Sequence, residues 1–207
     1  MKNVFRQLNV KKDKGHVNYA FGLALMLFVV LVIMYQVQIN AFKSTSQGIE
    51  DAIVDAALAS AIPNIKEYGK SGNLSLYSAT KESSDGSQTG KHMEQLEYSW
   101  KMFVAALSAE LDLDEKMVPQ NKELYGEKIV INDYRIYNVL DDKVYIWQRS
   151  GNNIVLTGSA KVGTINAPNG IPITKTSVYV DISSKIRGFF SVTIHANKKK
   201  LVAIENR

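Results

Sequence analysis

The 207-residue chain contains no cysteine and only three histidines, His16, His92 and His195, which are far apart in the sequence. The lack of cysteine excludes a disulfide framework, a thiolate zinc site, an iron–sulfur cluster and a cysteine nucleophile. The scattered histidines predict neither a histidine metal site nor a Ser-His-Asp triad. The G-x-S-x-G pattern and the glycine-rich phosphate-binding patterns are also absent. We therefore expect no catalytic activity, no cofactor and no metal.

Most of the net charge of the chain lies in its first residues. The net charge is +5, and residues 1–18 carry +4 of it, from five Lys or Arg residues and one Asp. A nucleic-acid-binding domain gathers basic residues on one folded face. Here the main body is almost neutral, and its one basic cluster, Lys198 to Lys200, is interpreted as a solvated turn. We expect no nucleic-acid partner.

Two acidic side chains, Asp112 and Asp114, are followed by Glu115 and offer oxygen ligands for a divalent cation. The segment lacks the Asp-x-Asp-x-Asp-Gly spacing with which a loop wraps calcium. It is interpreted as a solvated helix end.

No Asp, Glu, Lys or Arg occurs between Lys14 and Lys43, and the stretch from Tyr19 to Tyr35 is almost entirely apolar. A helix of about 20 residues rises about 30 Å and crosses the hydrocarbon core of a bilayer. The tyrosines at the two ends of the stretch are typical of the headgroup level. A transmembrane helix is therefore predicted over residues 17–42, and the lipid bilayer is a predicted partner.

The orientation of this helix follows from its flanks. Five Lys or Arg residues precede it, and only Lys43 lies just beyond it. The positive-inside rule places such a leader, residues 1–16, in the cytoplasm and residues 43–207 outside it. A cleaved secretory signal fits less well, because no small-x-small site follows the apolar stretch. The prediction is a single-pass protein of the cell membrane with a cytoplasmic N-terminus.

The exported part is predicted to be an α+β domain. Residues 44–68 form an alanine-rich amphipathic helix that continues the transmembrane helix and is kinked by Pro63. A Ser/Gly-rich loop covers 69–92, and a helix with an apolar stripe that includes Trp100 covers 93–113. From 129 to 207 apolar residues alternate, which predicts an antiparallel β-meander of five to six strands with the helices on one face. The expected strands are 129–140, 143–149, 154–165, 173–186, 189–196 and 201–204.

This order of segments resembles the type IV pilins and pseudopilins. The shared features are a basic leader that ends in Lys14-Gly15, an uncharged span, a continuing alanine-rich helix, a loop and a terminal antiparallel sheet. Two stretches are similar to the TadE-like pseudopilins of Tad (Flp) pilus systems in Gram-positive bacteria. They are IEDAIVDAALASAI, at residues 49–62, and APNGIPITKTSVYVDISSKIRGFFSVTIHANKKK, at residues 167–200.

The resemblance implies a processing site and partners. A prepilin peptidase would cut after Gly15, so that His16 becomes the first residue; alternatively, Gly15 is an ordinary flexible residue of a cytoplasmic tail. Family members often carry Glu five residues into the mature chain, where this chain has Ala20. That departure favours an accessory subunit over the major pilin. Ala20 and Ala24 offer a small-residue face for contact with another transmembrane helix.

Three functions remain open from the sequence. The first is a membrane-anchored, pseudopilin-like accessory subunit of a Tad/Flp-type pilus or secretion apparatus. It would be structural and non-catalytic, with other pilin-like subunits and an assembly platform as partners. The alternative is a signal-anchored cell-surface binding or adhesion domain that does not assemble into a filament. The third is an extracytoplasmic enzyme, for which no convergent acid, base and nucleophile can be named.

Overall fold

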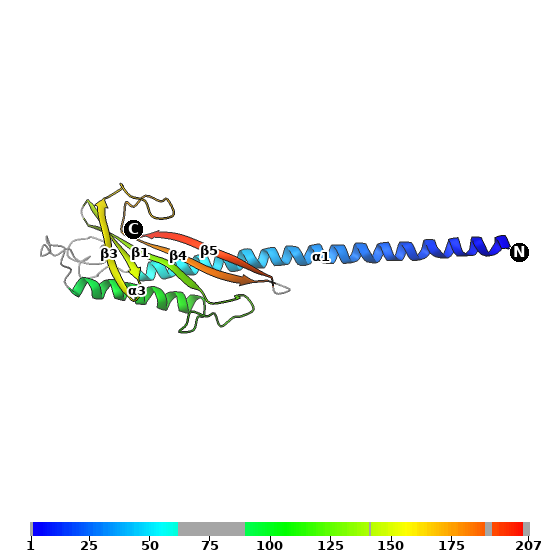
Figure 1. Cartoon of the computed structure of the whole chain (residues 1–207), viewed down its shortest axis with the longest axis horizontal. Coiled ribbons are helices and arrows are strands. Elements are labelled where there is room, and N and C mark those ends of the chain that lie inside the picture. Colours follow the sequence, from blue (N-terminus) through cyan, green and yellow to red (C-terminus); the bar gives the residue numbers. More distant parts are fainter. Residues whose placement is uncertain (1, 62–89, 141, 189–191, 205–207) are drawn as a thin grey trace. The chain divides into compact units, whose positions relative to one another are not determined.

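The computed structural model describes residues 2–61, 90–140, 142–188 and 192–204 of the chain (Figure 1). The chain divides into two compact units, Met1–Lys43 and Ser44–Arg207. The predicted α+β class is confirmed, with a long apolar helix, a second helix and a five-stranded antiparallel sheet. The elements are α1 (Lys2–Ser60), α3 (Gly90–Glu110), β1 (Val130–Leu140), β2 (Lys143–Ser150), β3 (Asn153–Lys161), β4 (Ser177–Arg187) and β5 (Thr193–Ala203).

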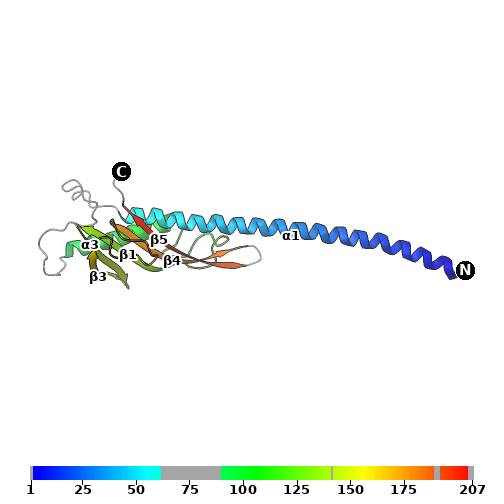
Figure 2. The same ribbon diagram turned by 90° about the horizontal axis from the view of Figure 1, so that it is seen from above.

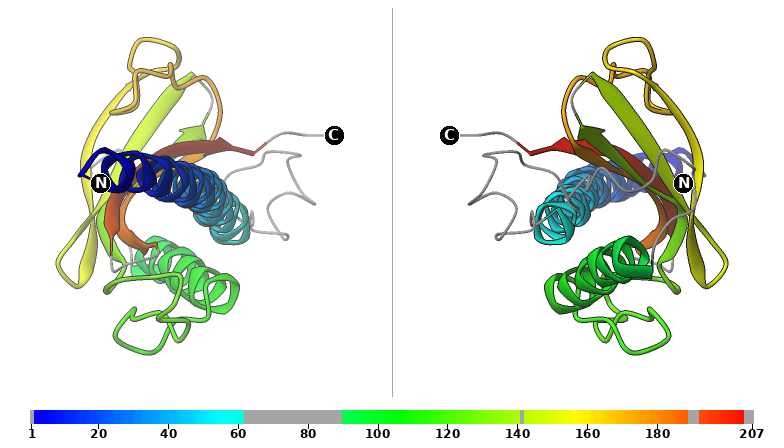
Figure 3. Two further views of the ribbon diagram at one scale, coloured as in Figure 1. Left: turned by 90° about the vertical axis from the view of Figure 1, so that its right-hand side faces the viewer. Right: turned by 90° about the vertical axis from the view of Figure 1, so that its left-hand side faces the viewer.

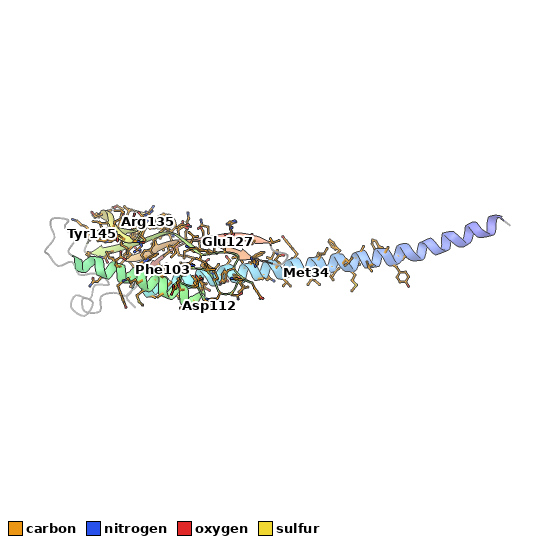
Figure 4. All side chains as sticks on the ribbon, turned by 60° about the horizontal axis from the view of Figure 1, so that its bottom comes forward. Met34, Phe103, Asp112, Glu127, Arg135 and Tyr145 are labelled. Carbon is orange, nitrogen blue, oxygen red and sulfur yellow. The ribbon has the colours of Figure 1, made fainter. Side chains whose placement is uncertain are left out.

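The first unit is helical, and its side chains from Tyr19 to Tyr35 are almost entirely apolar and almost all exposed. Asn18–Ser60 is the one candidate membrane span among the described residues; an 18-residue window within it has a mean hydropathy of 2.5, and none of that window is buried. Side chains near Met34 project both above and below the helix in the view of Figure 4. A helix with this pattern suits contact with lipid, because a domain surface would bury one face only. The finding is consistent with single-pass membrane anchoring.

The helix α1 runs through Gly48 without a break, so the apolar segment and the alanine-rich segment form one helix, as the sequence predicts. It ends at Ser60 and is followed by a turn at Ala61. The rest of the helix predicted to residue 68, the kink expected at Pro63 and most of the predicted loop lie outside the described residues. The second helix, α3, begins at Gly90, so residues 90–92 are helical where the sequence predicted the end of the loop.

The sheet has the strand order β3-β2-β1-β4-β5, and every neighbouring pair is antiparallel. β1, β2 and β3 follow one another as a meander, whereas β4 returns to the free side of β1 and not to β3. Residues 162–176 carry the chain across and form a folded loop, in which Ala167 N–H donates to the Ile171 carbonyl at 2.8 Å. Gly170 has a φ of 86° in this loop, which favours glycine.

The turn predicted at residues 197–200 is wrong. β5 is a single strand of eleven residues, and it pairs with β4 from Thr193 to Ala203. The three lysines are tolerated within the strand because carboxylates neutralise them. Lys199 lies opposite Asp181, with 3.6 Å between its Nζ and the carboxylate, and the other two reach Glu50 on α1.

Both helices of the second unit lie on the same face of the sheet (Figure 3). The predicted stripe of α3 is mostly confirmed: Leu96, Phe103, Leu107 and Leu111 are buried, but Trp100 is half-buried. The indole that is buried in the sheet is Trp147. The core side chains contributed by α1 are slim, so the helix can approach the strands closely: Ile49, Ala52, Ile53, Ala56 and Ala57.

The opposite face of the sheet has a smaller apolar cluster. Tyr137 and Tyr179 pack there with Val144, and the folded loop at residues 162–176 adds Ala167 and Ile173. The crossing connection therefore covers this face while it brings β4 next to β1.

Candidate functional site

The residues predicted from the sequence all lie on α1. Gly15 and His16 are within the helix, and the structure describes no side chain at either position. Ala20 and Ala24 are one turn apart and exposed, so they share a face of the helix. Large apolar side chains beside them are exposed too, for example Phe21 at 70% and Leu23 at 65%. Ala20 and Ala24 thus belong to an exposed helix surface that remains available to lipid or to another helix.

An ion-pair cluster joins the C-terminal part of α1, which belongs to the Ser44–Arg207 unit, to the edge of the sheet. Glu50 accepts from Lys198 Nζ at 3.1 Å and also pairs with Lys200. Figure 2 shows β5 beside this part of α1. The pKa of the Glu50 carboxyl lies below its usual value, because Lys200 and then Lys198 donate to the carboxylate and outweigh the opposing effect of burial.

This cluster predicts a pH-dependent contribution to stability. The pKa of Glu50 is lower in the folded chain than in the unfolded chain. The pairs therefore stabilise the fold above the ordinary glutamate pKa of about 4.3, and this stabilisation is lost as the pH falls through the lowered pKa. Solvent screens the pairs, since the Glu50 side chain is 32% exposed. Glu50→Gln is expected to lower the free energy of unfolding at pH 7 by up to about 1 kcal/mol.

Denaturant unfolding at pH 7 and below pH 4 measures this effect. The difference between wild type and Glu50→Gln should shrink at the lower pH. Asp55→Asn is the matched control, because Asp55 lies on the same helix and is exposed. An equal loss of stability in Glu50→Gln at both pH values would show that the cluster does not act through charge.

A buried hydrogen-bonded group connects the end of α1 to α3 and β1. Ser99 Oγ donates to the Ser60 carbonyl at 2.7 Å and lies 3.0 Å from the Tyr134 hydroxyl. Because the single Ser99 proton is used for Ser60, the Tyr134 hydroxyl donates to Ser99. Burial raises the pKa of Tyr134 to about 12, so this hydroxyl keeps its proton at physiological pH. Polar contacts thus fix the place where α1 ends on the sheet.

A cleft of about 450 Å³ opens where β1 and β2 separate. Its lining comes from α3, the loop before β1, β1 itself and the end of β2. The Arg149 guanidinium lies 4.7 Å from the centre of the Trp100 ring and donates to Glu97 at 2.9 Å. The other oxygen of Glu97 accepts from the Ile154 N–H at 2.9 Å, so one carboxylate holds α3 to the β2–β3 hairpin.

Sequence reasoning missed this cleft and the Glu50 cluster. The cleft is assembled from segments that are far apart in the chain, and nothing local marks it. The cluster had one usable signal: Lys198 and Lys200 are two apart, so they share one face if the segment is a strand.

The acidic residues that follow α3 are used within their own loop. The Asp114 carboxylate accepts from the backbone N–H groups of Lys116 at 2.8 Å and Val118 at 2.9 Å. Asp112 has a φ of 49°, a left-handed conformation that Asp tolerates better than most residues. Among the residues that the structure describes, no group of three or more His, Asp or Glu side chains is placed to hold a metal ion.

Comparison of the chain with protein-family models, with curated proteins and with solved structures finds no match.

Proposed function

We propose that the chain is a membrane-anchored, pseudopilin-like accessory subunit of a Tad/Flp-type pilus or secretion apparatus, structural and non-catalytic. The observation that carries the proposal is the double use of α1. Between Lys14 and Lys43 the helix has no charged side chain, and its last part supplies core residues to an α+β domain whose sheet covers it. One continuous helix would then anchor the subunit in the bilayer and carry the exported domain.

The proposed orientation depends on the basic leader. Five Lys or Arg residues precede the span, so the N-terminus stays in the cytoplasm and the Ser44–Arg207 unit is exported. In a filament, the apolar surface of α1 would pack against other such helices and leave lipid without becoming exposed to water. Ala20 and Ala24 support such packing, because small side chains let helix backbones approach closely.

Cleavage after Gly15 would make it easier for α1 to leave the membrane and pack in a filament. It would remove all five leader Lys and Arg residues. Each charge that remained would oppose exit from the membrane, since a charged side chain at the centre of the bilayer costs about 2.5–3.5 kcal/mol on insertion scales. A mature chain that begins at His16 would retain an apolar helix free to leave the bilayer.

Site-specific photocrosslinking in cells tests whether α1 packs against other subunits. A benzoylphenylalanine at Ala24 is expected to crosslink to chains that carry an N-terminal apolar helix of their own, identified by mass spectrometry. Met26 is the matched control: it is exposed at 70% and lies about 200° further round the helix. We expect a several-fold lower yield there. Only lipid adducts at Ala24, or equal protein crosslinks at both positions, would contradict the proposed contact.

The second candidate is a signal-anchored cell-surface binding or adhesion domain that never assembles. Two observations favour it: Ala20 stands where the resembled family often has Glu, and the exported unit has the cleft between β1 and β2. An uncut leader together with lipid-only crosslinks would select this candidate.

A further inference from the structure

Among the residues that the structure describes, one stretch of β1 has a neighbouring strand on one side only. On the β4 side it pairs from Val130 to Tyr137, with a register shift between Ile131 and Asp133. On the other side the pairing with β2 stops at Arg135, which lies opposite Gln148. Further back, the Ile129 N–H donates to the Met117 carbonyl at 2.9 Å. Residues 130–134 lie between these two contacts, and they line the cleft of about 450 Å³.

The backbone of Ile131 faces this gap. In an antiparallel strand, alternate residues direct their N–H and C=O groups to the same side. Because Ile129 donates to Met117 on the cleft side, Ile131 directs its own groups there as well. Five residues of strand span about 16 Å, so the gap offers room for a few residues of an extended chain.

The wall of the cleft beside Ile129 has a strained backbone. Met117 has a φ of 63°, which is uncommon for a residue with a long side chain. The conformation is supported locally: Met117 N–H donates to the Asp114 carbonyl at 2.9 Å, and Ser108 Oγ lies 3.8 Å from the Met117 sulfur. Such strain is found at ligand-binding walls when the surrounding loop maintains it. Here it places a carbonyl group in line with the outer edge of β1.

In the part of the chain that the structure describes, most charged side chains around the cleft are paired with one another, but one lysine is not. Arg149 is paired with Glu97, and Asp133 accepts from Arg135 and Gln148. Lys128, at the rim, is exposed and has no carboxylate within ion-pair distance among the described residues. The cleft therefore offers a cation to whatever enters it.

The shape of the cleft limits the occupant. The β2–β3 turn at Gly151 and Asn152 lines the cleft together with β1. A sheet edge from another folded domain would bring its own neighbouring strand about 4.8 Å away, and that strand would collide with the turn. A single unpaired segment avoids this collision.

We propose that this cleft docks a short extended segment of a partner protein, which adds to β1 beside Ile131 and places an acidic side chain against Lys128. Backbone hydrogen bonds supply affinity in this type of strand addition, and side-chain contacts supply specificity. The site lies within the Ser44–Arg207 unit and does not depend on cleavage of the leader.

The test uses the full chain in detergent micelles and an eight-residue probe peptide of alternating Val and Thr with one central Asp. The peptide is expected to slow hydrogen exchange at the Ile131 amide and to bind about three- to tenfold more tightly than the same peptide with Lys in place of Asp. Lys128→Glu should reverse that preference. Ile131→Pro should weaken binding about three- to tenfold, since it removes the outward N–H while a proline is tolerated on an unpaired edge.

Several results would overturn the proposal. They are no binding of the Asp peptide, unchanged binding by a folded Ile131→Pro variant, and an unchanged peptide preference in Lys128→Glu. If Ile131→Pro fails to fold, the exposed Lys128→Glu variant decides alone. Light scattering on the peptide-free chain tests whether a second copy of the chain occupies the cleft. A dimer that Lys128→Glu dissociates would assign the cleft to a second copy and not to a partner segment.

Discussion

Two arginines in the middle of the apolar stretch, Leu27→Arg with Val30→Arg, are expected to remove the protein from the membrane fraction. The reason is the cost of charge in hydrocarbon, about 2.5–3.5 kcal/mol for each arginine at the centre of a span, or about 5–7 kcal/mol for both. Both side chains are exposed, Leu27 at 56% and Val30 at 43%, so the substitutions disturb no packing within the chain. Membrane fractionation with alkaline extraction measures the loss.

The matched control places the same two charges beyond residues 17–42, the predicted transmembrane segment. Ser44→Arg with Gln47→Arg adds arginines at exposed positions of the same helix, and we expect this variant to remain in the membrane fraction. If the Leu27 and Val30 variant stays in the membrane as fully as wild type, α1 does not cross the bilayer.

The second large effect is expected in the core. Phe103→Ala should lower the free energy of unfolding by about 3–5 kcal/mol, because it removes a fully buried ring and leaves a cavity. The ring centre lies 5.1 Å from that of Tyr134 and 6.0 Å from that of Trp100, so two neighbouring aromatic side chains lose a contact. Figure 4 marks Phe103 on α3.

Tyr98→Ala is the control for this experiment. Tyr98 is an aromatic residue on the same helix but is 61% exposed, and its loss should change stability by no more than about 0.5 kcal/mol. Denaturant unfolding of the full chain in detergent micelles gives both values. Equal effects of the two substitutions would show that α3 does not pack its Phe103 face against the sheet.

Those parts of the fold whose signal is local were predictable from the sequence. The uncharged stretch between Lys14 and Lys43 predicts an apolar helix by its length alone, and α1 contains it. The spacing of Leu96, Phe103 and Leu107 predicts one buried face of α3, and all three are buried. Period-two alternation predicts the strands, because side chains of a strand point to opposite faces in turn.

Long-range pairing was not predictable in the same way. Short connections favour neighbours in sequence, yet β4 pairs with β1, because the loop at residues 162–176 packs Ala167 and Ile173 onto the sheet and covers Tyr137. The environment of the β5 lysines also depends on a contact between residues that are far apart in the sequence. Their charge predicts a solvated turn until Glu50, about 150 positions earlier in the sequence, is known to lie beside them.

The candidate site likewise has some features that the sequence predicts and others that it does not. Ala20 and Ala24 could be placed on one helix face from their spacing, and the structure places them there, exposed. Gly15 and His16 lie where no side chain is described, so cleavage between them remains a prediction from the resemblance. The cleft beside β1 arises from a separation of β1 and β2 that no periodicity in the sequence indicates.

The mass of the N-terminal peptide of the native chain tests the central proposal most directly. The chain is isolated from cells with and without the prepilin peptidase, and from a Gly15→Leu variant. A pseudopilin-like subunit predicts a chain that begins at His16 only when the peptidase is present and Gly15 is intact. A chain that begins at Met1 in all three cases would contradict the proposal and leave a permanently anchored binding domain as the better account.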